Sequence, residues 1–144
     1  MKRASLSVFL CALILGCTSR DDLVVWKAEL ASPDGAWLAT ADTVQNGGPG
    51  NAEIHTTVFL QGRDKQVPRQ EVFVIECQGP IPHPYTLDNV ANAGGCVGLT
   101  MVWSAPNQLH LSYEEKPGND VGLHVAKLAN VEITAGSRNV SISR

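Results

Sequence analysis

The chain of 144 residues carries 11 basic and 14 acidic side chains, a net charge of −3, and 44% of its residues are hydrophobic. This length is sufficient for one domain with a sizeable core, and the acidic balance argues against a nucleic-acid partner, because a phosphate backbone requires a basic surface. Beyond the amino-terminal segment, no apolar run is long enough to cross a bilayer.

The first sixteen residues have the anatomy of a secretory signal peptide. Lys2 and Arg3 form a cationic start, and residues 6–15 are an almost unbroken apolar run. As a helix this run rises only about 15 Å, roughly half the hydrocarbon thickness of a bilayer, so it is too short to span one. We therefore predict that residues 1–16 are a leader that is removed.

The sequence Ile14-Leu15-Gly16-Cys17 resembles the lipobox of bacterial lipoproteins, although Leu15 is bulkier than the residue typical of that family. The resemblance implies cleavage before Cys17, a diacylglycerol on its sulfur and a further acyl chain, such as palmitate, on its amine. Two or three chains anchor a protein essentially permanently. An ordinary secreted protein, cleaved elsewhere, is the alternative.

The same resemblance predicts where the protein resides and how the chain is divided. It implies the cell envelope, and Thr18 after the cysteine implies the outer membrane, facing the periplasm, if the cell is Gram-negative. Residues 17–22 would be the lipidated tether and residues 23–144 a β domain. The five residues 18–22 reach at most about 17 Å, so the domain is expected near the lipid headgroups.

Alternating apolar and polar residues predict strands along the domain. Residues 23–30 and 36–44 flank a tight turn, Ser32-Pro33-Asp34-Gly35, and residues 62–70 form a charged turn. No helical periodicity extends beyond two turns. We expect an all-β domain of about eight or nine antiparallel strands, a small sandwich or a partly open barrel. The remaining predicted strands are 54–61, 71–77, 97–103, 108–115, 121–128, 130–134 and 139–143.

Residues 31–39, ASPDGAWLA, resemble the S-P-D-G hairpin of the blade repeats in TolB-type propeller proteins, and residues 102–111 resemble it more weakly. The resemblance implies a hairpin but not a propeller, because four blades of about forty residues do not fit into this domain. A lipobox followed by S-P-D-G and a Gly/Asn-rich loop also resembles small bacterial lipoproteins of unknown function, which implies no activity.

The four cysteines have distinct predicted fates. Cys11 leaves with the leader and Cys17 carries lipid, so Cys77 and Cys96 remain. Two remaining thiols in an exported chain most simply form a disulfide, which would stabilise the fold by roughly 3 kcal/mol. A redox pair and a thiolate metal site are the alternatives, and the C-x-x-C spacing of a redox motif is absent.

The segment between these cysteines contains three prolines within five positions, at residues 80, 82 and 84. Proline prevents a regular ladder strand and stiffens an extended chain. A stiff loop presenting Ile81, His83 and Tyr85 would lose little entropy on binding, which makes it a candidate contact surface. The alternative is a cover over one edge of the sheet.

Three histidines are the best candidates for chemistry. His55, His110 and His124 fall on the polar faces of their predicted strands, and together they would hold zinc or copper only if those strands were neighbours. The sequence contains no G-x-S-x-G or S-x-x-K motif for a nucleophilic serine. We therefore predict no catalytic residue, no metal and no cofactor.

These features favour a membrane-anchored extracytoplasmic lipoprotein that acts as a non-enzymatic binding or envelope-structural module. The expected partners are the membrane, through lipid on Cys17, and an envelope protein or polymer. One alternative is an inhibitor or immunity-type protein that presents the loop between Cys77 and Cys96. Another is a small metal-dependent hydrolase, which convergence of the three imidazoles within about 6 Å would favour.

Overall fold

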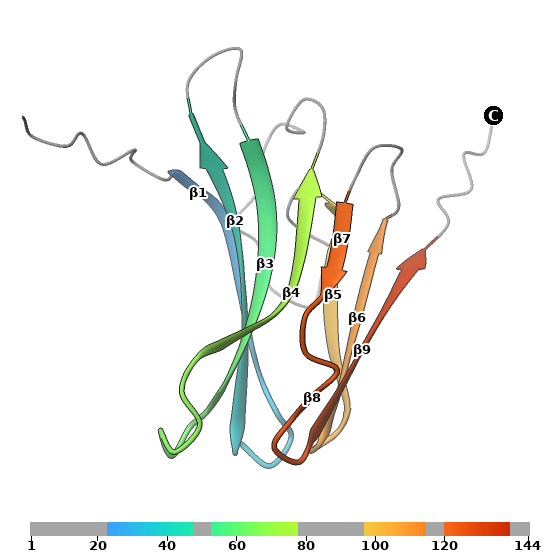
Figure 1. Cartoon of the computed structure of the whole chain (residues 1–144). Coiled ribbons are helices and arrows are strands. Elements are labelled where there is room, and N and C mark those ends of the chain that lie inside the picture. Colours follow the sequence, from blue (N-terminus) through green and yellow to red (C-terminus); the bar gives the residue numbers. More distant parts are fainter. Residues whose placement is uncertain (1–22, 48–52, 78–96, 115–119, 139–144) are drawn as a thin grey trace, which may run out of the picture.

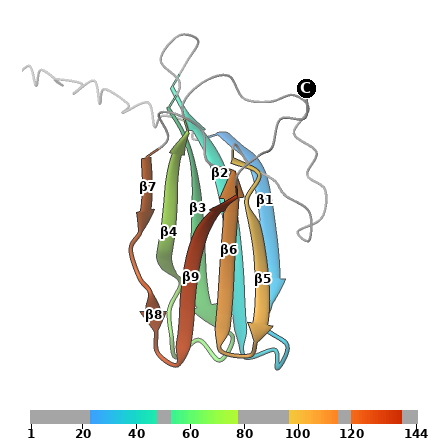
Figure 2. The ribbon, with the colours of Figure 1, turned by 90° about the vertical axis from the view of Figure 1, so that its right-hand side faces the viewer.

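A computed structural model describes residues 23–47, 53–77, 97–114 and 120–138. In this part of the chain nine strands form two sheets that pack face to face (Figures 1 and 2). The prediction of an all-β fold is confirmed, and the architecture is a sandwich rather than a closed barrel. The described residues include no helix with the length and hydropathy to cross a membrane.

The first sheet is antiparallel throughout, with strand order β1-β2-β3-β4-β7. Its first four strands form a meander because each pair is consecutive in the chain. The strands are β1 (Leu23–Ala31), β2 (Trp37–Asn46), β3 (Glu53–Gly62), β4 (Gln70–Cys77) and β7 (Asp120–Leu123).

The second sheet is mixed, with strand order β5-β6-β9-β8. The prediction that all strands are antiparallel is wrong at one pair, because β6 and β9 run parallel, with Leu109 opposite Ile133. β8 runs toward a turn and β9 returns from it, so β9 runs alongside β6 in the same direction (Figure 2). The strands are β5 (Thr100–Ala105), β6 (Gln108–Glu114), β8 (Lys127–Leu128) and β9 (Val131–Arg138).

Residues 124–126 carry the chain from the first sheet to the second. The amides of His124 and Val125 both donate to the carbonyl of Val72, at 2.9 and 3.2 Å. The predicted strand over 121–128 is therefore wrong, since it divides into β7 and β8 in different sheets. The predicted strand 130–134 is longer than expected, since β9 continues through Gly136 and Ser137 to Arg138, and the predicted strand 139–143 lies outside the described residues.

The core lies between the inner faces of the two sheets. β4 contains a bulge, because Val58 is opposite Phe73 but Phe59 is opposite Glu71. The bulge allows the consecutive residues Val72 and Phe73 both to be buried. The other buried apolar residues are Trp26, Ala28, Trp37, Ala39, Ala41, Ile54, Leu60, Ile75, Val97, Leu99, Met101, Leu109, Leu111, Val131 and Ile133, with Val58 beside them.

Four short turns gather at one end of the sandwich, which we call the turn end. They join β1 to β2, β3 to β4, β5 to β6 and β8 to β9, and they lie at the bottom of Figure 1, opposite the start of β1 at Leu23. With a rise of about 3.3 Å per residue, the length of β1 separates Leu23 from the turn end by about 26 Å.

Candidate functional site

The β1–β2 turn at the turn end is held by side-chain hydrogen bonds. The Ser32 hydroxyl donates to Asp34 Oδ1 at 2.6 Å, and the Ala36 amide donates to the same oxygen at 3.1 Å. These donors hold the pKa of Asp34 below its usual value of 3.8, the Ser32 hydroxyl most strongly. Gly35 has φ +72°, the left-handed conformation that glycine adopts at little cost, so the predicted tight turn is confirmed.

The β3–β4 connection, residues 62–69, is a second tight turn, which we call the cationic hairpin. The Lys65 amide donates to the Gly62 carbonyl at 3.1 Å, and the Gly62 amide donates to the Val67 carbonyl at 3.0 Å. Asp64 Oδ1 accepts the Gln66 amide at 3.0 Å. Lys65 has φ +63°, so a long side chain occupies a left-handed backbone position where glycine is favoured.

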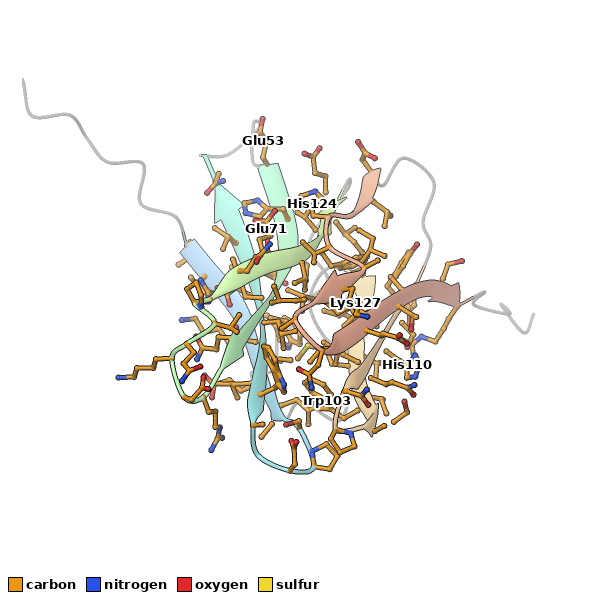
Figure 3. The ribbon with its side chains drawn as sticks, turned by 60° about the horizontal axis from the view of Figure 1, so that its bottom comes forward. Glu53, Glu71, Trp103, His110, His124 and Lys127 are labelled. Atoms are coloured by element: carbon orange, nitrogen blue, oxygen red, sulfur yellow. The ribbon has the colours of Figure 1, made fainter. Side chains whose placement is uncertain are left out.

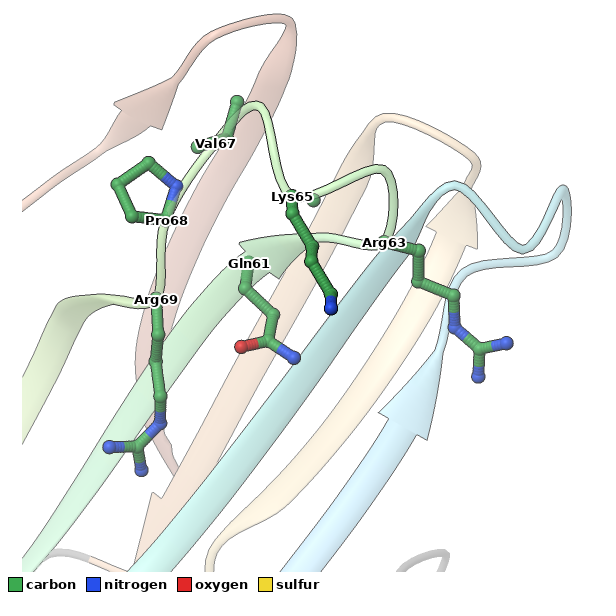
Figure 4. A pocket seen from close by; sticks show the side chains of 7 residues that line it. Gln61, Arg63, Lys65, Val67, Pro68 and Arg69 are labelled. Carbon is green, nitrogen blue, oxygen red and sulfur yellow. The ribbon is translucent and has the colours of Figure 1, made fainter.

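Basic side chains of the cationic hairpin line a hollow of about 450 Å³. Arg63, Lys65 and Arg69 contribute the charge, and Gln61 contributes an amide from the end of β3. In Figure 4 Lys65 and Gln61 lie near the centre of the hairpin, with Arg69 on one side of them and Arg63 on the other. The hollow is thus lined by residues that carry guanidinium, ammonium and amide donors, a set of groups that suits an anionic ligand.

Arg69 is held in place by two contacts on the outer face of the first sheet. Its guanidinium lies 3.3 Å from the centroid of the Phe59 ring and donates to Asp42 Oδ2 at 3.1 Å. The β4 bulge puts Phe59 opposite Glu71, two positions from Arg69. A planar guanidinium over an aromatic face is a favourable cation–π geometry, so this arginine is oriented before any ligand arrives.

The cationic hairpin is joined to the β1–β2 turn. The Arg63 amide donates to the Ala36 carbonyl at 2.9 Å, which fixes the two loops side by side. The sequence identified residues 62–70 as a charged turn but not as a site. The signal that was available is three basic residues within seven positions, in a chain that is acidic overall.

The three histidines lie on different parts of the surface. His55 is on the outer face of the first sheet, beside inward-pointing Ile54, and His110 is on the outer face of the second sheet, between buried Leu109 and Leu111. His124 lies beyond β7, where its Nδ1 is 2.8 Å from Glu71 Oε1 (Figure 3). The described residues contain no group of three histidine, cysteine or acidic side chains that would hold a metal.

His110 belongs to a chain of hydrogen bonds across the second sheet. Its Nε2 is 2.7 Å from the Ser104 hydroxyl and its Nδ1 is 2.5 Å from the Thr134 hydroxyl. A serine bonded to an imidazole supplies two members of a catalytic triad, but the third position here holds the neutral hydroxyl of Thr134 instead of a carboxylate. All three residues lie on the outer face of the second sheet, and none of them lines the hollow at the cationic hairpin.

A second hollow, of about 340 Å³, lies between the edges of the two sheets near the turn end. It is lined mainly by apolar groups of β1 and β5, with Leu30, Pro33 and Trp103 among them. The indole nitrogen of Trp103 donates to the Leu30 carbonyl at 3.3 Å, so this tryptophan links the sheets.

Most of the residues predicted as sites lie outside the described residues. These are Cys17, Ile81, His83, Tyr85 and Cys96. Cys77 ends β4, opposite Ile54, and packs against the core. The pairing of Cys77 with Cys96 and the binding role of the loop between them therefore stay predictions.

Comparison with protein-family models, with curated proteins and with solved structures finds no match to this chain.

Proposed function

We propose that this protein is a membrane-anchored extracytoplasmic lipoprotein whose β domain is a non-enzymatic binding module. Lipid on Cys17 is the anchor, and the turn end of the sandwich is the surface that meets a protein or polymer of the envelope. The lipobox-like sequence before Cys17 and the leader ahead of it support the anchor.

The observation that carries the proposal is that the start of β1 and the four short turns lie at opposite ends of the sandwich. The tether enters β1 at Leu23, and the turns lie at the opposite end (Figure 1). With Cys17 in the membrane, β1 would hold these turns about 26 Å beyond Leu23, facing away from the lipid. Loops presented on a rigid sandwich are the usual place for binding residues.

The described surface supports binding more than catalysis. The three histidines do not converge, which removes the arrangement that would favour a metal-dependent hydrolase using them. Ser104 and His110 form a hydrogen-bonded pair, yet they lie on an outer sheet face and not in either described hollow. A hydrolase also needs donors for a developing oxyanion and a space that excludes water.

The test of the anchor is the mass of the native product. We expect intact-mass spectrometry to give a mature chain that begins at Cys17 and carries diacylglycerol, and we expect fatty-acid labelling of the wild type. Cys17→Ser should abolish labelling and release the protein from the membrane fraction. A retained leader or an unmodified amino terminus would overturn the proposal.

A further inference from the structure

We propose that the cationic hairpin binds a phosphomonoester, the doubly charged phosphate carried by a phosphorylated sugar or lipid. The inference goes beyond the proposed function, which gives the same turn end a protein or polymer of the envelope as its partner. Its chemistry comes from Arg63, Lys65, Arg69 and Gln61, which are among the residues that line one hollow (Figure 4).

The first argument is the concentration of charge. Nine basic residues follow Cys17, and three of them lie between positions 63 and 69. The same part of the hairpin holds a single acidic residue, Asp64, whose Oδ1 accepts the Gln66 amide. A protein with a net negative charge thus presents a local positive site, which attracts anions and orients their approach.

The second argument is the number of charges that are left for a ligand. Asp42 neutralises Arg69. Neither Arg63 nor Lys65 forms an ion pair with another described residue. With Asp64 counted, the hairpin keeps one net positive charge, and the side chains of Arg63 and Lys65 offer two cationic groups to a phosphomonoester, which carries about −1.5 to −2 at neutral pH. Arginine is also suited to bind two phosphate oxygens at once.

The third argument is the conformation of Lys65. A non-glycine residue at positive φ costs on the order of 1 kcal/mol, and such residues cluster at functional sites. Glycine would relieve this strain but would remove the ammonium group from the hollow. A binding role for the ammonium group accounts for lysine at this position.

The fourth argument is that the site is formed in advance. Arg69 is fixed by Phe59 and Asp42, the Arg63 backbone is fixed by Ala36, and Pro68 restricts the chain between them. The backbone and Arg69 are thus ordered in advance, and the side chains of Arg63 and Lys65 are what a ligand would still have to order. The hollow of about 450 Å³ is also within the range of about 300–1,000 Å³ that is typical of small-ligand sites.

The test is isothermal titration calorimetry on the full chain as the cell produces it, purified in a non-ionic detergent. Glucose 6-phosphate is titrated at constant ionic strength, with glucose and with sodium chloride as controls. We expect saturable binding of the phosphate alone. Lys65→Ala, Lys65→Gly and Arg63→Gln should each weaken it about threefold to tenfold, while Lys127→Gln, a matched charge removal on β8, should leave it unchanged.

A soluble short-chain phosphatidic acid and the corresponding phosphatidylglycerol form the second arm. Tighter binding of phosphatidic acid than of glucose 6-phosphate would point to a lipid source, and the reverse order would point to a sugar phosphate. Equal binding of the phosphatidylglycerol diester would overturn the monoester assignment. Absence of binding to both monoesters, or equal binding by Lys65→Ala and the wild type, would overturn the site.

This experiment separates the two proposals. The mass of the same preparation reports whether Cys17 carries lipid, whereas the calorimetry reports the hairpin. An unmodified Cys17 with intact phosphate binding would remove the anchor and keep the site. A lipidated chain that does not bind the phosphate would keep the anchor and remove the site.

Discussion

The guanidinium of Arg69 lies 3.3 Å from the centroid of the Phe59 ring, and the same group donates to Asp42. One arginine thereby connects the cationic hairpin to the outer face of the first sheet. The connection orients a basic side chain that would otherwise lose several rotamers on binding an anion.

Arg69→Met should lower the free energy of unfolding by about 0.5–1 kcal/mol, because both of its contacts are partly exposed to solvent. Urea denaturation measures the change. Phe59→Leu should cost less in the Arg69→Met background than in the wild type. Strictly additive effects would show that the ring and the guanidinium are not coupled.

Lys65→Gly should raise the free energy of unfolding by about 1 kcal/mol or less, since it relieves positive φ but frees the unfolded chain. Lys65→Ala is the matched control, because it removes the charge and keeps the strain. Thermal melts should therefore separate the two variants. A gain in both would assign the effect to charge instead of backbone conformation.

Asp34→Asn should destabilise the protein at neutral pH and have progressively less effect in acid. The pKa of Asp34 is lowered in the folded state, so the unfolded state binds more protons between the two pKa values. The stabilisation is complete above the unfolded value and is lost as the pH falls through the lower folded value. Urea denaturation between pH 6 and about pH 2 measures it. Ser32→Ala, which removes the main donor, should show the same trend, and a constant difference across pH would contradict this explanation.

Cys77→Ser combined with Cys96→Ser should lower the stability by roughly 3 kcal/mol, the entropic value for a closed loop of this length. Intact-mass measurement on the wild type before and after reduction should show a gain of about 2 Da, one hydrogen on each sulfur. Two thiols that alkylate without prior reduction would contradict the pairing.

Trp103→Phe should lower the free energy of unfolding by about 1 kcal/mol, because it deletes the hydrogen bond to the Leu30 carbonyl that links the two sheets. Chemical denaturation measures this loss. An unchanged stability would mean that water satisfies the carbonyl equally well.

Much of the sheet structure was predictable from local pattern. The predicted strand 54–61 matches β3, and its alternation follows burial, with Ile54, Val58 and Leu60 inside and His55 on the outer face as expected. The parallel pairing of β6 and β9 was not predictable, because alternation does not reveal which sheet a strand joins. The pairing joins residues 108–114 to residues 132–138, and the chain reaches the second sheet only after residues 124 and 125 have bonded to Val72 of the first, some fifty positions away.

The candidate site was only partly visible in the sequence. Three basic residues near a turn identify a charged loop, but their convergence depends on nonlocal structure. The β4 bulge sets which residue lies opposite Phe59, and the turn geometry sets the backbone of Lys65. The predicted contact residues Ile81, His83 and Tyr85 rested on proline stiffness alone, with no information on their neighbours.

The crossing at residues 124–126 also bears on how the chain folds. β7 pairs with β4, and β9 lies between β6 and β8. Because the pairs β4–β7 and β6–β9 join residues distant in sequence, we expect them to form late in folding. The early meander can assemble first, but both sheets stay incomplete until this last stretch arrives. We expect slow folding. Until these pairings form, β4 and β6 expose unpaired edges, and the risk of aggregation is greatest then.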